Sequence, residues 1–219
     1  TGAEKRKCWL RECAAKKDEW FDFKKARINA APLADVVWQK PVLTQPAALH
    51  TVSSFANAVG AIKFFDAGDV QATGFQIVED DVPSQTFTET GASFMGFSGS
   101  ALLGAAYVKD AKYGIAFTGD GSFMMNPQIL IDGVEHGVRG MIALFDNRRM
   151  GAITGLQYDQ YGKEFKTNDS VPVDYVAMAG SVTGVKAVHA GFTKVSLEAA
   201  LMEAFEHNGL SLVHIPVYS

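Results

Sequence analysis

Cysteine is scarce in this chain of 219 residues, and neither sign of charge is in large excess. The two cysteines, Cys8 and Cys13, lie five positions apart, on different faces of a predicted helix, which argues against a disulfide or a shared metal ion. We therefore interpret both as free thiols in a reducing, cytoplasmic compartment. The formal net charge of -4 argues against a basic surface that binds nucleic acid or an anionic membrane.

Long apolar runs are also missing, because none approaches the roughly 18–20 residues that a membrane-spanning helix needs. Residues 1–7 are polar and charged, unlike a signal peptide. Hydrophobic residues make up 47% of the chain and charged residues 20%, which is typical of one large globular domain, or of one domain with an appendage. Because Thr1 stands first instead of methionine, we expect the chain to derive from a longer one.

Residues 4–28 are predicted to form an amphipathic helix, in which Trp9, Trp20 and Phe23 are interleaved with many charged residues. This helix has no core of its own and leads into a linker that reaches Pro41. The predicted organisation is therefore an N-terminal helical extension with a linker over residues 1–42, followed by one domain over residues 43–219.

In the domain over residues 43–219, helical and strand patterns alternate. Predicted strands lie at residues 61–67, 113–118, 141–145, 184–188 and 210–217, the last of them closing the sheet. Predicted helices lie at residues 47–58, 96–108, 126–137, 174–179 and 196–207, with Gly209 as a left-handed stop after the last helix. Residues 68–90 are predicted to be irregular. This alternation implies an α/β fold, a parallel sheet with right-handed crossovers and helices on both faces.

Polar residues directly follow two neighbouring predicted strands. Gly119-Asp120-Gly121-Ser122 follows the first strand, and Asp146-Asn147 follows the second. Because parallel strands present their carboxyl ends at one edge of a sheet, Asp120 and Asn147 are expected to meet there. The glycines let the backbone approach a ligand, and the side-chain oxygens suit magnesium bound to phosphates. Each motif alone is also ordinary turn chemistry, so it is their pairing that indicates a site.

This pairing resembles the motif of thiamine diphosphate enzymes, in which Gly-Asp-Gly is followed at a distance by Asn, often as Asn-Asn. Here Asp146 stands where the family often has the first Asn. Two further segments, in the family's order, strengthen the resemblance. Residues 66–71 look like the loop that borders the diphosphate, and residues 91–97 look like the segment that holds the aminopyrimidine ring. The resemblance covers the chain from about residue 43 to its end and identifies a C-terminal diphosphate-binding domain.

The resemblance implies thiamine diphosphate and Mg²⁺ as cofactors and assigns roles to nine residues. It implies that magnesium is bound by the side chains of Asp120 and Asn147 and by the carbonyl of Arg149. It implies that the cofactor contacts Gln71, Ser93, Met95, Gly119, Asp120, Gly121, Ser122 and Asn147. Backbone N–H groups of Gly121 and Ser122 are expected to bind the diphosphate, and Met95 is expected to support the bent cofactor, although a core methionine is an even alternative. Asp69 is expected to point away from the phosphates.

The family keeps its activating glutamate in a separate pyrimidine-binding domain, and no segment here resembles that domain. Glu89 is the only local substitute. The resemblance therefore implies that another chain or domain completes the active site, within an oligomer of at least two such units. No catalytic side chain is assigned within this chain.

Within the family, residues 144–147, 150–153 and 156–157 look nearest to the acetolactate synthase-like branch, and especially to the trihydroxycyclohexanedione acylhydrolases. This resemblance implies cleavage or formation of a carbon–carbon bond next to a carbonyl, in a 2-oxo acid or a 1,2-dione. Two alternatives stay open: a degenerate, non-catalytic module that stabilises a partner, and a phosphate–metal enzyme such as a phosphatase. The sequence leaves the substrate open, and also whether the reaction is hydrolysis, decarboxylation or ligation.

Overall fold

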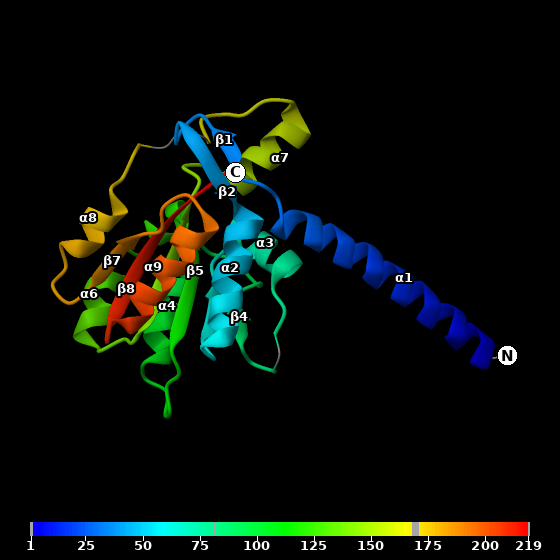
Figure 1. Ribbon diagram of the computed structural model, residues 1–219, viewed down its shortest axis with the longest axis horizontal. Helices are drawn as coiled ribbons and strands as arrows, with labels where there is room; N and C mark the ends of the chain where they lie inside the picture. The colour runs from blue at the N-terminus through cyan, green and yellow to red at the C-terminus, as the bar shows by residue number, and fades with distance from the viewer. Residues whose placement is uncertain (1, 81, 168–170, 219) are drawn as a thin grey trace.

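The centre of the structure is a mostly parallel sheet, seen in a computed structural model that describes residues 2–80, 82–167 and 171–218 (Figure 1). Seven of the eight described strands follow the order β1-β2-β8-β6-β5-β3-β4, and the eighth, β7, pairs with β8 outside this order. The strands are β1 (Leu33–Asp35), β2 (Lys40–Thr44), β3 (Ile62–Phe65), β4 (Thr86–Thr88), β5 (Gly114–Gly119), β6 (Gly140–Asp146), β7 (Lys186–His189) and β8 (Leu210–Tyr218). Only the β1–β2 pair is antiparallel among the pairs described.

Helices cover both faces of this sheet, which confirms the predicted α/β fold. They are α1 (Gly2–Ile28), α2 (Gln45–Ala58), α3 (Asp69–Ile77), α4 (Phe97–Ala105), α5 (Asp120–Phe123), α6 (Ile129–Glu135), α7 (Gly151–Tyr161), α8 (Tyr175–Gly180) and α9 (Lys194–Glu206). One core cluster joins α2, α3 and α9 to the sheet, and a second joins α4, α6 and α8 to its other face. Successive strand residues point to opposite faces of the sheet. Phe117 and Phe145 therefore belong to the first cluster, and Ala116 and Leu144 belong to the second.

A row of aromatic rings lies beneath the carboxyl edge of the sheet. The rings of Phe65 and Phe117 stack with centroids 4.3 Å apart, and Phe117 stacks on Phe145 at 6.1 Å. These three side chains come from β3, β5 and β6 and are nearly inaccessible to solvent. They give the three strand ends that carry the predicted site a rigid, apolar base.

Helix α1 forms as predicted, but little of it packs on the domain (Figure 1). Lys24 is buried and pairs with Glu79, while Trp9 and Trp20 are 62% and 49% exposed. The expected amphipathic character is therefore not used for packing within the described structure. None of the described helices combines the length and the apolar character needed to cross a membrane.

Four local expectations are wrong. Residues 68–90 are not irregular, because a turn at Gly68 (φ 86°) leads directly into α3, and β4 pairs with the edge of β3. Gly209 is not a left-handed stop, since α9 ends at Glu206, the backbone is already extended at His207, and Gly209 has no positive φ. Strand β8 does not close the sheet but lies inside it, between β2 and β6, and its first eight residues are all buried. Residues 33–42 of the expected linker form β1 and most of β2, which extends the sheet.

Glycine at position 140 is required for close packing at the amino end of β6. A Cβ atom there would lie 2.7 Å from the carbonyl oxygen of Gly114 on β5 and 2.8 Å from Leu102. We expect Gly140→Ala to lower the free energy of unfolding by about 2 kcal/mol, because the backbone of β5 must shift. Gly155→Ala is the matched control: its Cβ meets nothing within 4 Å, and helix α7 should gain about 0.5 kcal/mol. Urea unfolding of both variants measures the difference, and equal effects would contradict this account.

Candidate functional site

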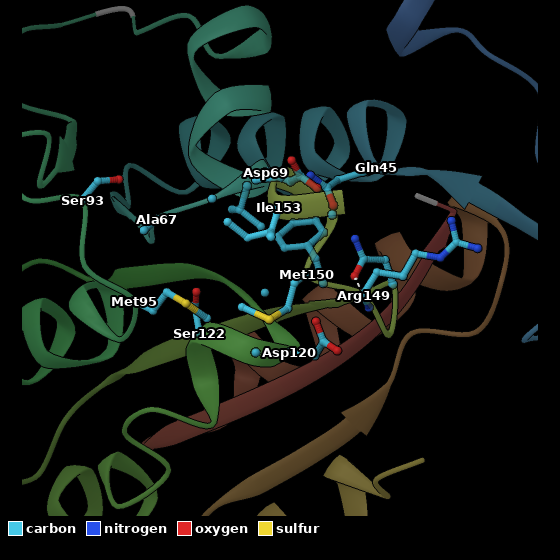
Figure 2. A pocket seen from close by; sticks show the side chains of 18 residues that line it. Gln45, Ala67, Asp69, Ser93, Met95, Asp120, Ser122, Arg149, Met150 and Ile153 are labelled. Carbon is cyan, nitrogen blue, oxygen red and sulfur yellow. Dashed lines mark hydrogen bonds between the residues drawn. The ribbon is translucent and has the colours of Figure 1, made fainter. Parts of the chain in front are cut away.

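The carboxyl ends of β5 and β6 bring the two predicted motifs together. Gly119 pairs with Phe145 in the parallel ladder, so Asp120 and Asp146 follow side by side. Asp120 and Asn147 both line one cavity of about 290 Å³ (Figure 2). Eight of the nine predicted site residues line this cavity: Ser93, Met95, Gly119, Asp120, Gly121, Ser122, Asn147 and Arg149. The sequence therefore located the cavity, while the individual roles stay predictions.

Gln71 is the predicted site residue that lies elsewhere. It lines a neighbouring hollow of about 210 Å³ with Phe65 and Phe75. Its Nε2 donates to Thr88 Oγ1 at 2.6 Å, and its Oε1 accepts a hydrogen bond from Ser93 Oγ at 3.1 Å. In the described structure Gln71 therefore holds the segment that carries Ser93 against β4.

Asp120 is a buried carboxylate with a perturbed pKa. The residue is 8% exposed and begins α5 directly at the end of β5. Burial, and next the nearby Asp146 carboxylate, raise the pKa of Asp120 to about 7. A carboxylate whose charge is this costly to bury is one that a bound cation would stabilise.

Asn147 lies in a turn stabilised by two successive side-chain-to-backbone bonds. Its Oδ1 accepts a hydrogen bond from Arg149 N at 2.9 Å, and Asp146 Oδ1 accepts one from Arg148 N at 3.1 Å. Between them Arg148 adopts a left-handed conformation, with φ 55°. A carboxamide oxygen has two acceptor positions, so this bond leaves Asn147 Oδ1 able to bind a cation.

Two further segments complete the cavity lining, one with Met95 and one with Ala67 and Asp69. Met95 lies next to Gly121, where an added Cβ would meet its methyl group at 3.3 Å, so Met95 is a cavity residue and not only a core residue. Asp69 also lines the cavity, contrary to the expectation that it points away. Its carboxylate faces Gly151, and burial raises its pKa. Helix α3, which begins at Asp69, directs this side chain toward α7.

Asp66 was not predicted as a site residue, yet it joins three parts of the site. Its Oδ1 accepts hydrogen bonds from the backbone N–H groups of Ala67 and Gly96 at 3.0 and 2.8 Å. Its Oδ2 accepts from the hydroxyls of Ser98 and Thr118, both at 2.8 Å. The carboxylate thereby fixes the loop that carries Met95 to the ends of β3 and β5. In the sequence, Asp66 is marked only as an acidic residue at the end of an apolar run and as the first residue of the segment that resembles the family's diphosphate loop.

Asp120→Asn is expected to stabilise the metal-free chain at neutral pH. The folded chain holds the Asp120 proton more tightly than the unfolded chain, so the group's stabilising contribution is complete below pH 3.8 and is lost as the pH rises through about 7. Relative to wild type, the variant should gain about 2 kcal/mol of unfolding free energy between pH 5 and pH 8. Urea unfolding at both pH values measures this gain. The exposed control Asp159→Asn should show none, and an equal gain in the two variants would contradict the assignment.

Comparisons with known proteins agree with this geometry. The family model "Thiamine pyrophosphate enzyme, C-terminal TPP binding domain" matches residues 66–215. The 3D-(3,5/4)-trihydroxycyclohexane-1,2-dione hydrolase of Bacillus subtilis (strain 168) is 32% identical over 156 residues, which are 68% of this chain and 24% of the relative. The enzyme of the same name from Listeria monocytogenes serotype 4b (strain F2365) is 32% identical over 181 residues, 80% of this chain and 28% of the relative.

A solved structure shares the fold. Benzoylformate decarboxylase from Polynucleobacter necessarius superposes with a TM-score of 0.71 at 18% identity, covering 80% of this chain and 33% of that chain. The chain thus spans only about a quarter of the length of the curated relatives it matches. The matched residues include both strand-end motifs and most of the cavity lining. This chain belongs to the thiamine pyrophosphate enzymes, and residues 66–215 are their C-terminal cofactor-binding domain.

Proposed function

We propose that this chain binds thiamine diphosphate through Mg²⁺, as one half of an enzyme that cleaves or forms a carbon–carbon bond next to a carbonyl. The observation that carries the proposal is the convergence of Asp120, Asn147 and Arg149 on one cavity beside Gly119 and Gly121. Relatives named as hydrolases of a cyclic 1,2-dione support a 1,2-dione or a 2-oxo acid as the substrate class. The substrate itself and the outcome of the reaction stay open.

The residues present fit a magnesium ion that bridges to a diphosphate. A carboxylate, a carboxamide oxygen and a backbone carbonyl are hard oxygen donors, and three of them leave positions for phosphate oxygens and water. Gly119 and Gly121 carry no side chain into the cavity, so the backbone beside Asp120 is open to a close ligand. In the proposed complex, Asp120, Asn147 and the Arg149 carbonyl hold the metal, while N–H groups of Gly121 and Ser122 bind the diphosphate.

The opposite side of the cavity is proposed to hold the aminopyrimidine end. Ser93 and Met95 lie there, on the loop that Asp66 and Gln71 fix in place. Bound thiamine diphosphate supplies the nucleophilic carbon and the electron sink for chemistry next to a carbonyl. The contribution of this chain is to bind and orient that group, with Met95 supporting it from beneath and the apolar lining excluding water.

The activating glutamate is proposed to come from another chain or domain. Glu89, the local substitute, is half-buried, and its carboxylate accepts a hydrogen bond from Ala92 N at 3.0 Å, so it already stabilises the turn before Ser93. Helix α7 borders the cavity and exposes a set of large apolar side chains that a partner is proposed to cover. They are Ile153, Leu156, Tyr158 and Tyr161. We propose that the active form is an oligomer of at least two complete units.

A non-catalytic module is the second candidate, because two carboxylates and an apolar side chain lie in or beside a cavity that is proposed to hold an anionic diphosphate. Asp69 places a negative charge on the cavity lining, Val70 offers no polar contact there, and Asp146 adds a second buried carboxylate close to Asp120. Such a module would stabilise its partner without binding the cofactor. Metal-dependent cofactor binding separates the two candidates.

Asp120→Ala is expected to weaken Mg²⁺-dependent binding of thiamine diphosphate at least about 100-fold, because the charged metal ligand is lost. Native mass spectrometry first identifies any chain that co-purifies, and calorimetry on the resulting assembly, with and without Mg²⁺, measures the affinity. The control Asp159→Ala, on exposed helix α7, should bind like wild type. An assembly that ignores the cofactor would favour the non-catalytic module, and wild-type affinity in Asp120→Ala would refute the proposed metal site.

A further inference from the structure

His214 on β8 forms a buried pair with Asp146, the residue directly before Asn147. Its Nε2 lies 2.9 Å from Asp146 Oδ2, and the two side chains are only 7% and 3% exposed. In the parallel ladder His214 pairs with Leu144, two residues before Asp146 on β6. The contact therefore joins the central strand β8 to the end of the strand that carries the predicted metal ligands.

Asp146 faces away from the cavity. Its neighbours Phe145 and Asn147 both line the cavity, whereas Asp146 does not, as alternation along a strand requires. It lies instead on the face that α8 covers, where the rings of Tyr175 and His189 approach His214 with centroids 5.5 and 5.1 Å away. The ring of Trp38 lies 6.0 Å from His214 on the same side. Packing against three rings limits the orientations open to the imidazole.

The other oxygen of Asp146 stabilises the turn of the metal site. Asp146 Oδ1 accepts the N–H of Arg148, and Asn147 Oδ1 accepts the N–H of Arg149, with Arg148 left-handed between them. Two of the three proposed metal ligands, the side chain of Asn147 and the carbonyl of Arg149, lie in this turn. One carboxylate thus connects His214 to the backbone that presents these ligands.

We propose that His214 is a positioning residue for the metal site, whose hydrogen bond to Asp146 keeps that carboxylate turned away from the cavity and holds the turn at Asn147. The inference rests on the proposed function, because it concerns how this chain presents its ligands to Mg²⁺. His214 touches neither cofactor nor metal and acts only through Asp146.

Electrostatics explains why such a residue is needed. Asp146 lies close enough to Asp120 to raise its pKa, so the site contains two buried carboxylates beside the place proposed for a diphosphate. A buried carboxylate that loses its donor must find another partner or cation, because an unpaired charge is costly to bury. Without His214, the metal itself becomes a cation toward which Asp146 can turn. Reorientation toward it would break the bond to Arg148 N and bring a second carboxylate, besides that of Asp120, against the diphosphate.

The test compares His214→Phe, His214→Gln and the double variant His214→Phe/Asp146→Asn in the full assembly. Manganese, read by electron paramagnetic resonance in the presence of thiamine diphosphate, reports metal affinity, and thermal unfolding reports stability separately. His214→Phe keeps a ring but no donor, and should weaken Mn²⁺ binding about 10–100-fold. His214→Gln keeps a donor and should bind near the wild-type value. The double variant should recover most of the affinity, since the introduced carboxamide is neutral and its oxygen still accepts from Arg148 N.

A residue needed only for packing would give a different pattern. Wild-type affinity in His214→Phe, or no recovery in the double variant, would overturn the inference. Should His214→Phe not fold, the Mn²⁺ affinities of Asp146→Ala and Asp146→Asn are compared instead. Only the alanine variant should lose affinity, and equal binding by both variants would overturn the inference. Asp120→Ala is the reference. If wild type binds Mn²⁺ no better than Asp120→Ala, the proposed function itself fails. If wild type binds better than Asp120→Ala but His214→Phe binds like wild type, the inference alone fails.

Discussion

The register of β5 against β6 is the constraint on which the site depends. Gly114 pairs with Gly140 at one end of the ladder, and Gly119 pairs with Phe145 at the other. A shift of one residue would turn Asn147 to the opposite face of the sheet and bring Asp146 toward Asp120. The tight approach of two glycines at the amino end and the stacked Phe117 and Phe145 at the carboxyl end both oppose such a shift. The geometry of the predicted metal ligands is thus a property of the whole ladder.

The order of strands and helices, and the edge of the sheet where the motifs meet, could be predicted from the sequence. Apolar runs of strand length, such as residues 141–145, separated by helical patterns leave few alternatives to a parallel sheet. The glycines around Asp120 and the polar pair Asp146-Asn147 marked the ligand-binding edge because they directly follow two neighbouring strands. Errors arose where tertiary pairing overrides local pattern: β4 is a three-residue edge strand that exists only because β3 lies beside it.

The residues that the sequence did not reveal are those whose partners lie far along the chain. Asp66 receives hydrogen bonds from residues 30, 32 and 52 positions away, and His214 pairs with a residue 68 positions away. No local spacing predicts such contacts, because they depend on which strands become neighbours. Gln71 shows the converse, since a position in a family segment predicted a ligand contact, whereas in the described structure its amide binds Thr88 and Ser93.

The raised pKa of Asp120 means that its negative charge carries an unfavourable free energy unless a cation is bound beside it. A ligand that neutralises this carboxylate removes that unfavourable term. Binding of the ligand and folding of the chain are therefore linked equilibria. Destabilising substitutions in the core, far from the cavity, would then be tolerated while the ligand is bound. Without the ligand, the same substitutions would lower the fraction of folded chains. The supply of the ligand during growth would thus help decide how much sequence variation this fold can accumulate.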